Sequence, residues 1–365
     1  MNKATLEAEQ NFLKKQERLQ MGQAQTKRSK NKNNRNLKFD SMEEYFIRNG
    51  GILLEKQIAL SQGQHKGAGQ LKIFSRNDIE KATNNYDPDL IVGRSAHHTV
   101  YKTTIEDRVL AVQAPSKRES NPLLIDLTLT EACTVMVMNH DNMVKLYGCC
   151  LETFVPIPVY EFLSNADLFH HLHGDIASSK RIKWADRLRA ATDTAYALSY
   201  MHNALAKPVV HRGVNSSSVL LDFSCNAKLT NFGYSVSITP GEKPQRWPIE
   251  GTPGYIDPEY VETQEVTDKC DVYSFGVLLF ELLTRRQPIL MARDGTDLVD
   301  VFVSAVRKNC VMEIIDSEVL EEENRDGIQR VARLALSCVA KKGAERPTMI
   351  DVVGELWNIQ GKDNK

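Results

Sequence analysis

Three histidines and two adjacent cysteines are the residues of this chain whose types and spacing first suggest chemistry. His170, His171 and His173 lie close together in FHHLHG and could ligate a metal ion. Cys149 and Cys150 follow a predicted strand and could act in redox chemistry. For the histidines we favour an ordinary helical segment, and for the cysteines we favour packing in or near the core.

A segment rich in hydroxyl groups is a third candidate. Its side chains could accept a phosphate or another modification that reorders the segment. The alternative interpretation is a flexible polar loop that carries no signal. The candidate acceptors are Ser235, Ser237, Thr239 and Thr252.

The composition indicates an ordinary folded protein. The 365 residues are 42% hydrophobic and 25% charged, with a formal net charge of −1. At roughly 100–200 residues per domain, this length predicts about two structural units. The sequence has no long uninterrupted apolar run and no export signal at its start, and its seven cysteines are scattered, so we expect a soluble protein of the reducing cytosol.

The N-terminal region is strongly basic. Residues 1–38 hold ten Lys or Arg and three Glu, and Thr26–Lys38 has six basic residues and no acidic one. Such a run could be a solvated tail, could hold the chain at an anionic membrane face, or could be a nuclear-import or nucleic-acid patch. We favour the solvated tail, keep peripheral contact with the inner face of the plasma membrane as an alternative, and expect no nucleic acid, because no aromatic residues interleave for base stacking.

Patterned segments begin after this tail. A helix is conceivable at residues 3–21, Tyr45–Ala59 is apolar but interrupted by Gly50–Gly51, and Ser61–Gln70 reads as a linker. Short β-favouring runs and one helix then give way to helical segments, the most apolar of which is predicted to be buried. The strands are predicted at Leu90–Gly93, Thr99–Lys102, Val109–Ala114, Val144–Gly148 and Pro156–Phe162, and the helices at Leu123–Met138, Asp186–Met201 and Asp271–Thr284.

Six stretches follow one another along the chain: FSRNDIEKATNNYDPDLIVGRS, NHDNMVKLYGCCLE, PVYEFLSNADLFHHLHG, VVHRGVNSSSVLLD, GTPGYIDPEY and DKCDVYSFGVLLFELLT. Their residues, order and spacing resemble the eukaryotic protein kinases, and more narrowly the plant receptor-like cytoplasmic kinases of the wall-associated-kinase-like type. The resemblance implies an α+β, two-lobed fold with a small β-sheet N-lobe that carries helix αC and a larger helical C-lobe. It places the N-lobe at about 73–162 and the C-lobe at about 163–361, after a tail and linker at 1–72.

The resemblance also implies where phosphoryl transfer would occur. That reaction needs a glycine-rich lid and a Lys–Glu pair that together hold the phosphates. Of the three lid glycines only Gly93 remains, because Ser95 and His98 occupy the other two positions. The lysine position is Gln113, which is neutral. Glu131 matches the helix-αC glutamate, and we expect it either to hydrogen-bond Gln113 or to face solvent.

The catalytic loop and the metal-binding triplet are also altered. Gly213 occupies the position of the general-base aspartate, and Asn215 that of the lysine that stabilises the γ-phosphate. Ser218 and Asn231 occupy the two metal-binding positions, where a neutral oxygen is a weak ligand for a hard cation. We therefore expect no catalytic residues, no bound metal and no required cofactor.

A residual nucleotide cleft is still implied by the resemblance. It would allow weak ATP binding without turnover, and a collapsed cleft is the alternative. Its implied lining is Gly93, Val100, Ala111, Gln113, Glu131, Tyr160 and Phe162.

By contrast, the positions that hold the scaffold in this family are present. Glu259 is expected to have Arg346 as its buried partner, and Asp271 to brace the backbone of the catalytic loop. His211 and Phe232 match the apolar stack that joins the lobes. Gly276 is expected to permit close helix packing.

A preserved fold with altered chemistry predicts a binding protein. By resemblance, we expect a pseudokinase adaptor of plant innate immunity. Its partners would be a nucleotide-binding leucine-rich-repeat immune receptor, bound through the C-lobe, and receptor-like cytoplasmic kinases modified by bacterial effectors, or those effectors themselves. The alternative function is a weak, atypical ATP-dependent Ser/Thr kinase.

Overall fold

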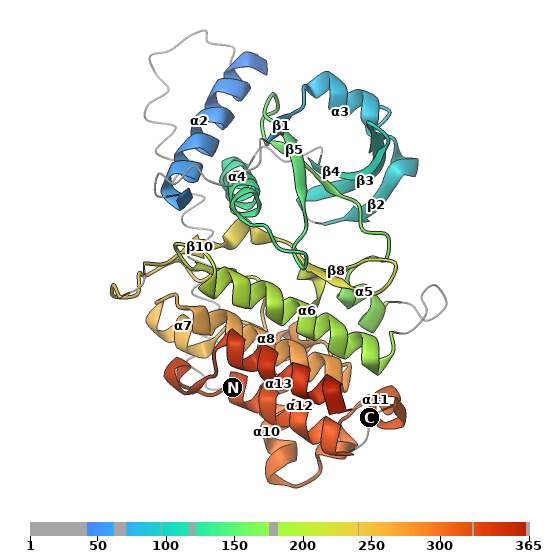
Figure 1. Ribbon diagram of the computed structural model, residues 1–365, viewed down its shortest axis with the longest axis vertical. Coiled ribbons are helices and arrows are strands. Elements are labelled where there is room, and N and C mark those ends of the chain that lie inside the picture. The colour runs from blue at the N-terminus through green and yellow to red at the C-terminus, as the bar shows by residue number, and fades with distance from the viewer. Residues whose placement is uncertain are drawn as a thin grey trace.

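The computed structural model describes residues 42–61, 71–95, 97–116, 121–174, 182–239, 241–322 and 325–362. The possible helix at 3–21, the basic run Thr26–Lys38 and all but the first residue of the predicted linker lie outside these ranges. Two lobes follow one another along the chain, a β-sheet lobe and a helical lobe (Figure 1). No described helix is both long enough and apolar enough to span a bilayer.

The small lobe is built on a six-stranded sheet with the order β1-β5-β6-β4-β3-β2. Its pairings are antiparallel except for the parallel pair β1–β5. This mixed sheet confirms the predicted fold class, and each of the five predicted strands is found with its ends shifted by a few residues. The strands are β1 (Lys72–Ile73), β2 (Ile91–Arg94), β3 (His98–Ile105), β4 (Arg108–Pro115), β5 (Leu146–Cys150) and β6 (Ile157–Glu161).

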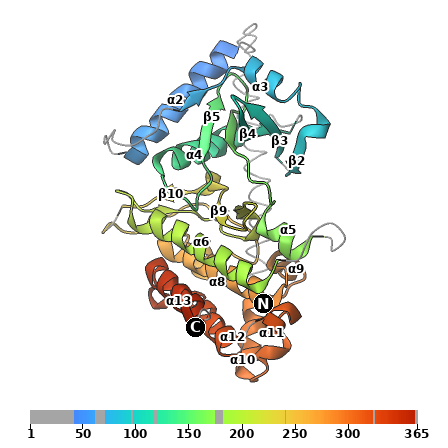
Figure 2. The same ribbon diagram turned by 45° about the vertical axis from the view of Figure 1, so that its right-hand side comes forward.

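Two helices pack together beside this sheet. Helix α4 (Pro122–Val137) is the predicted αC, and helix α2 (Met42–Ser61) lies along it in both views (Figures 1 and 2). Lys56 of α2 pairs with Asp126 of α4 at 2.8 Å, and Leu53 is buried between them. The helix α2 runs through Gly50–Gly51, so the break expected there is wrong: burial of one helix face outweighs the poor helix propensity of glycine.

The large lobe is helical around one central helix. Helix α8 (Asp268–Thr284) is buried along nearly its whole length, as its apolar sequence predicts. A Cβ on Gly276 would lie 2.7 Å from Cβ of Cys338, so glycine is needed where α12 crosses α8. The other α-helices of the described lobe are α5 (Leu168–His173), α6 (Trp184–Asn203), α7 (Pro258–Thr263), α9 (Pro288–Arg293), α10 (Leu298–Arg307), α11 (Ser317–Glu322), α12 (Arg325–Cys338) and α13 (Met349–Lys362).

Short strands and 3-10 helices complete the two lobes. Strands β8 (Val219–Leu221) and β9 (Ala227–Leu229) pair antiparallel. Strands β7 (Val209–Val210) and β10 (Val236–Ser237) pair antiparallel and flank the catalytic-loop segment. The 3-10 helices are η1 (Pro88–Leu90), η2 (Ser216–Ser218), η3 (Phe232–Tyr234), η4 (Val311–Glu313) and η5 (Gly343–Glu345).

Candidate functional site

The sheet register brings most of the predicted cleft residues onto one face. Gly93 is paired with Val100, and Val100 with Gln113. Ala111 stands two positions before Gln113 and is paired with Tyr160. Because directly paired residues and residues two apart on a strand share a face, these five side-chain positions line the same side of the sheet.

Glu131 meets Tyr160 at the back of this face. Its carboxyl group is buried and lies against the Tyr160 hydroxyl and the backbone of Asn231. Burial raises the pKa of Glu131 to about 7, and these two contacts lower it only in part. Within the described residues no hydrogen bond joins Glu131 to Gln113, and Oε1 of Glu131 has no hydrogen-bond partner.

Both expectations for Glu131 are therefore wrong. The side chain neither faces solvent nor bonds Gln113, because α4 is packed close to the sheet and turns the carboxyl toward β6. The sequence offers one signal for this contact. Tyr160 follows three apolar residues in β6, and a buried tyrosine hydroxyl usually seeks a polar neighbour.

In the lid region the hydroxyl group of Ser95 forms hydrogen bonds with the backbone of His98. Oγ of Ser95 accepts from the backbone N–H of His98 at 3.1 Å and donates to its carbonyl at 3.3 Å. A glycine lid would leave such backbone N–H groups for phosphate, whereas here a side chain occupies one of them. Further along β3, Nζ of Lys102 lies 4.8 Å from the centre of the Phe162 ring.

Asn215 and Ser218 are occupied by each other. Oδ1 of Asn215 accepts from the backbone N–H groups of Ser217 and Ser218 at 2.8 and 3.0 Å. Oγ of Ser218 accepts from the Asn215 N–H at 3.0 Å and donates to the Asn215 carbonyl at 2.7 Å. This reciprocal capping of η2 engages the Asn215 amide oxygen and the Ser218 hydroxyl in local hydrogen bonds. Nδ2 of Asn215 donates to Thr252 at 2.8 Å.

Gly213 leaves an open position in the catalytic loop. A Cβ built there would come no closer than 3.4 Å to the His211 ring, which is an ordinary contact. The fold therefore does not require glycine at this position. The absence of a carboxylate here changes the chemistry of the loop without relieving a steric conflict.

Asn231 adopts the left-handed backbone conformation, with φ 67° and ψ 48°. Asn tolerates this region better than most residues, so the conformation survives the replacement of an acidic side chain. Its Nδ2 lies 3.4 Å from the carbonyl of Ser217, and its side chain is exposed.

The backbone of the catalytic loop is held by one buried carboxylate. Asp271 accepts from the backbone N–H groups of His211 and Arg212 at 2.7 and 2.8 Å, and it lies 2.9 Å from Nε2 of His202. Burial alone would raise the pKa of Asp271, but these interactions lower it below its ordinary value. The geometry matches the bracing role expected for this residue.

The aromatic stack between the lobes also has the expected geometry. The rings of His211 and Phe232 lie edge to face with centroids 5.0 Å apart, and both side chains are fully buried. Nε2 of His211 is 2.9 Å from the carbonyl of Thr230. Burial lowers the pKa of His211, which favours a neutral ring that packs in the stack. Nδ1 of this ring accepts the backbone N–H of Gly213.

The ion pair predicted for Glu259 needs a correction. Arg346 is bound bidentately by Asp257, at 2.5 and 2.7 Å, and both side chains are buried. Glu259 is 3.9 Å from Arg346, is 41% exposed, and accepts the Gly343 N–H at 2.6 Å. Asp257 caps α7 immediately before Pro258, so its carboxylate is fixed and points inward, and an Asp-Pro pair at a helix start was the signal available in the sequence.

The four candidate modification residues differ in their environments. Ser235 is buried, and its hydroxyl lies 3.5 Å from the His211 carbonyl. Ser237 lies in β10, half-buried, and Thr252 accepts the hydrogen bond from Asn215. Thr239 is exposed. The structure therefore brings Thr252 to the catalytic loop but leaves Thr239 outside it.

The histidine and cysteine clusters match the favoured interpretations. The three histidines lie on the helix α5, where Nε2 of His173 is 2.8 Å from Glu281 and the ring of His171 contacts a backbone carbonyl. Cys149 and Cys150 are both fully buried, and burial raises the pKa of Cys150 to about 11. A thiol of this kind packs as a small apolar side chain.

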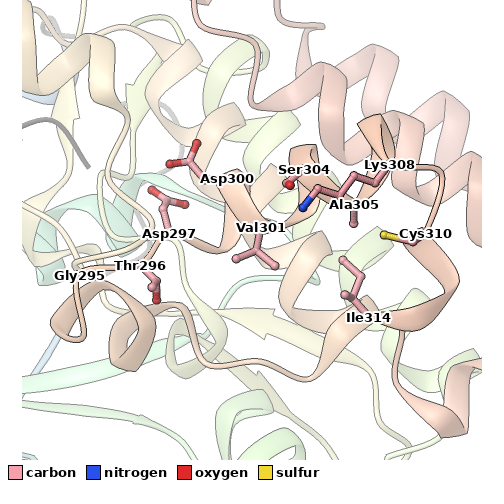
Figure 3. A pocket seen from close by; sticks show the side chains of 10 residues that line it. All are labelled: Gly295, Thr296, Asp297, Asp300, Val301, Ser304, Ala305, Lys308, Cys310 and Ile314. Carbon is pink, nitrogen blue, oxygen red and sulfur yellow. The ribbon is translucent and has the colours of Figure 1, made fainter.

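A separate cavity of about 450 Å³ lies in the large lobe beside α10. Figure 3 shows the carboxylates of Asp297 and Asp300 toward one end and Lys308 and Cys310 toward the other. None of the residues predicted from the sequence lines it.

Most of the chain matches a known protein family. Residues 91–356 match the family model described as protein tyrosine and serine/threonine kinase, a range that begins in β2 and ends in α13. The chain belongs to this kinase family. The altered positions expected from the resemblance, from Gln113 to Asn231, all lie inside the matched range.

Curated plant relatives narrow the place of the chain within the kinase family. It is 39% identical over 329 residues to putative wall-associated receptor kinase-like 16 of Arabidopsis thaliana, covering 88% of this chain and 73% of the relative. Wall-associated receptor kinase-like 4 is 38% identical and wall-associated receptor kinase 3 is 39% identical, both from the same plant. These matches cover 89% and 88% of this chain but only 42% and 43% of the relatives. The predicted resemblance to plant receptor-like kinases is confirmed.

Proposed function

We propose that this kinase-family chain is a catalytically inactive pseudokinase that acts by binding other proteins. One observation carries the proposal: in a preserved kinase fold, the positions at which this family carries charge or binds metal for phosphoryl transfer hold other, uncharged residues. These are Gln113, Gly213, Asn215, Ser218 and Asn231.

The surroundings of these positions support inactivity. Glu131 keeps its place on α4, but burial without a lysine raises its pKa to about 7, so no full ion pair is available there. The side-chain oxygens of Asn215 and Ser218 form the hydrogen bonds that cap η2. A general base alone contributes about 10²–10⁴ in rate, and the loss of several such groups leaves no obvious substitute.

The partner side of the proposal rests on the plant receptor-like kinase relatives and on the preserved scaffold. We propose an adaptor in plant innate immunity that links a nucleotide-binding leucine-rich-repeat receptor to kinases modified by bacterial effectors, or to the effectors. The fold offers a rigid base for such contacts, because the Asp271 and Arg346 networks are complete and buried. Apolar side chains that stay more than half exposed on α2, such as Ile47, Leu54 and Ile58, are suited to protein contacts.

Phosphotransfer from radiolabelled ATP tests the inactivity. The purified chain is assayed with Mg²⁺ and with Mn²⁺, on itself and on a generic substrate, beside the variant Asn231→Ala. We expect no label in either protein. Label in the wild-type chain that disappears in Asn231→Ala would mean that Asn231 holds a metal ion, and the atypical Ser/Thr kinase would replace the pseudokinase.

Binding is tested separately by reconstitution. The chain is co-expressed with a plant receptor of the leucine-rich-repeat class and with an effector-modified cytoplasmic kinase, and the complexes are isolated by size exclusion. A ternary complex that forms only when the chain is present supports the adaptor. Receptor and kinase that associate equally well without it would contradict that role.

A further inference from the structure

Helix α13 exposes two large apolar side chains. Its inner face, with Met349, Val352 and Leu356, is buried against the large lobe. On the outer face Ile350 is 56% exposed and Trp357 is 61% exposed. α13 lies at the outer surface of the lobe in both views (Figures 1 and 2). An exposed tryptophan is the kind of side chain that dominates binding when a partner covers it.

Two glycines lie in the same stripe. Positions 350, 354, 357 and 361 are separated by four, three and four residues, so they share one face of the helix. A Cβ on Gly354 or Gly361 would meet nothing within 4 Å. Glycine is a poor residue for a helix interior, and no contact within the described chain explains either one.

We propose that a second copy of this chain covers the stripe through a two-fold, antiparallel pairing of α13. In the register that sets Gly354 opposite Trp357 of the partner subunit, Ile350 falls opposite Gly361 of the partner subunit. Every large side chain then meets a glycine, and the two-fold axis repeats both contacts. One stripe thus supplies both the large side chains and the glycines that make room for them. An unrelated protein would match this spacing only by chance.

The remaining positions fit this pairing. The same register sets Asp351 opposite Gln360 of the partner subunit, so a polar pair borders the apolar centre. The antiparallel arrangement also opposes the two helix macrodipoles. One helix stripe buries less surface than the roughly 1,000 Å² expected of a stable interface, so the dimer is weak and depends on concentration.

Sedimentation velocity over a range from low to high micromolar concentration tests the proposal on the full chain. We expect a monomer–dimer equilibrium in the wild-type chain, abolished by Trp357→Ala and by Gly354→Leu. The second variant fills the notch and should fold, because its new side chain has free space in the monomer. Gly354→Ala is expected to raise the melting temperature of the monomer while weakening the dimer, a combination that a merely structural role of the glycine would not give.

Phe223→Ala is the matched control. Phe223 is 84% exposed at the turn between β8 and β9, far along the chain from α13, and its loss should leave the equilibrium unchanged. A monomer at every concentration would overturn the proposal. So would a dimer that survives both Trp357→Ala and Gly354→Leu, because the copies would then meet elsewhere.

Discussion

Two buried carboxyl groups, Asp271 in the scaffold and Glu131 on the face of the predicted cleft, differ in what surrounds them. Asp271 receives two backbone N–H groups and faces His202, and its pKa is lowered. Among the described residues no cation stabilises Glu131, and burial raises its pKa to about 7. The contrast teaches that a buried carboxyl group keeps its charge where several donors hold it, as in the scaffold, and is readily protonated where burial outweighs its contacts.

Removing the scaffold arginine should have the largest effect. Arg346→Ala leaves Asp257 buried without its partner, which is expected to cost about 3–5 kcal/mol in the free energy of unfolding. Urea denaturation followed by circular dichroism measures this loss.

Glu259→Ala is the control for that variant. Glu259 is 41% exposed and 3.9 Å from Arg346, so its removal should cost far less. Equal losses in the two variants would restore Glu259 as the main partner of Arg346 and would refute the role given to Asp257.

Neutralising the cleft carboxyl should stabilise the chain at high pH. The folded-state pKa of Glu131 is raised to about 7, above the ordinary value near 4.3, so its protonated form is favoured by folding. The stability that this proton confers is complete below about pH 4 and is lost as the pH rises to 7. Glu131→Gln should therefore exceed the wild-type chain by up to about 3 kcal/mol at pH 8 and by much less at pH 5.

Unfolding by urea at several pH values measures this difference. Asp271→Asn serves as the opposite control, because the pKa of Asp271 is lowered and its ionised form stabilises the fold at neutral pH. A gain for Glu131→Gln that is the same at pH 5 and pH 8 would contradict the titration of Glu131 between them.

Restoring the missing acid should have the smallest effect on stability. Gly213→Asp has room for its Cβ, so the free energy of unfolding should change by no more than about 0.5 kcal/mol. Phosphotransfer should remain absent, because Gln113 and Asn231 still lack charge.

Gly254→Asp is the matched variant in the scaffold. Gly254 has φ 87°, and a Cβ there would lie 2.6 Å from the Pro288 carbonyl, so the same change should be strongly destabilising. Melting temperatures of the two variants measure the contrast. A large loss in Gly213→Asp would mean that the catalytic loop has come to depend on its glycine.

Much of the fold follows from the sequence because its elements carry local signals. The strands β2 to β6 and the buried helix α8 have apolar patterns of the right period, and the structure has them. Strand β1 has two exposed residues and no such pattern, so it could not be predicted. The helix α2 was interrupted in the prediction because glycine propensity is local, whereas packing on α4 is not.

The candidate site was predictable in its residues and less so in their contacts. The positions that break the kinase pattern are visible one by one in the sequence. Their partners depend on a few ångströms of packing: Glu131 turns to Tyr160, and Arg346 binds Asp257 more closely than Glu259, which lies 3.9 Å away. Such choices between neighbouring acceptors are decided by the tertiary arrangement, which a motif does not encode.

The pairing of β7 with β10 makes the hydroxyl groups of the hydroxyl-rich segment differ in their accessibility to a modifying enzyme. Thr239 stands in solvent beyond the end of β10, whereas Ser235 is buried just before it. An enzyme that modifies this segment can reach Thr239 at the rate of collision, but it must wait for β10 to detach before it reaches Ser235. The ratio of the modification rates of Ser235 and Thr239 would therefore report how often β10 opens. A partner bound over β10 would slow modification of Ser235 and leave that of Thr239 unchanged.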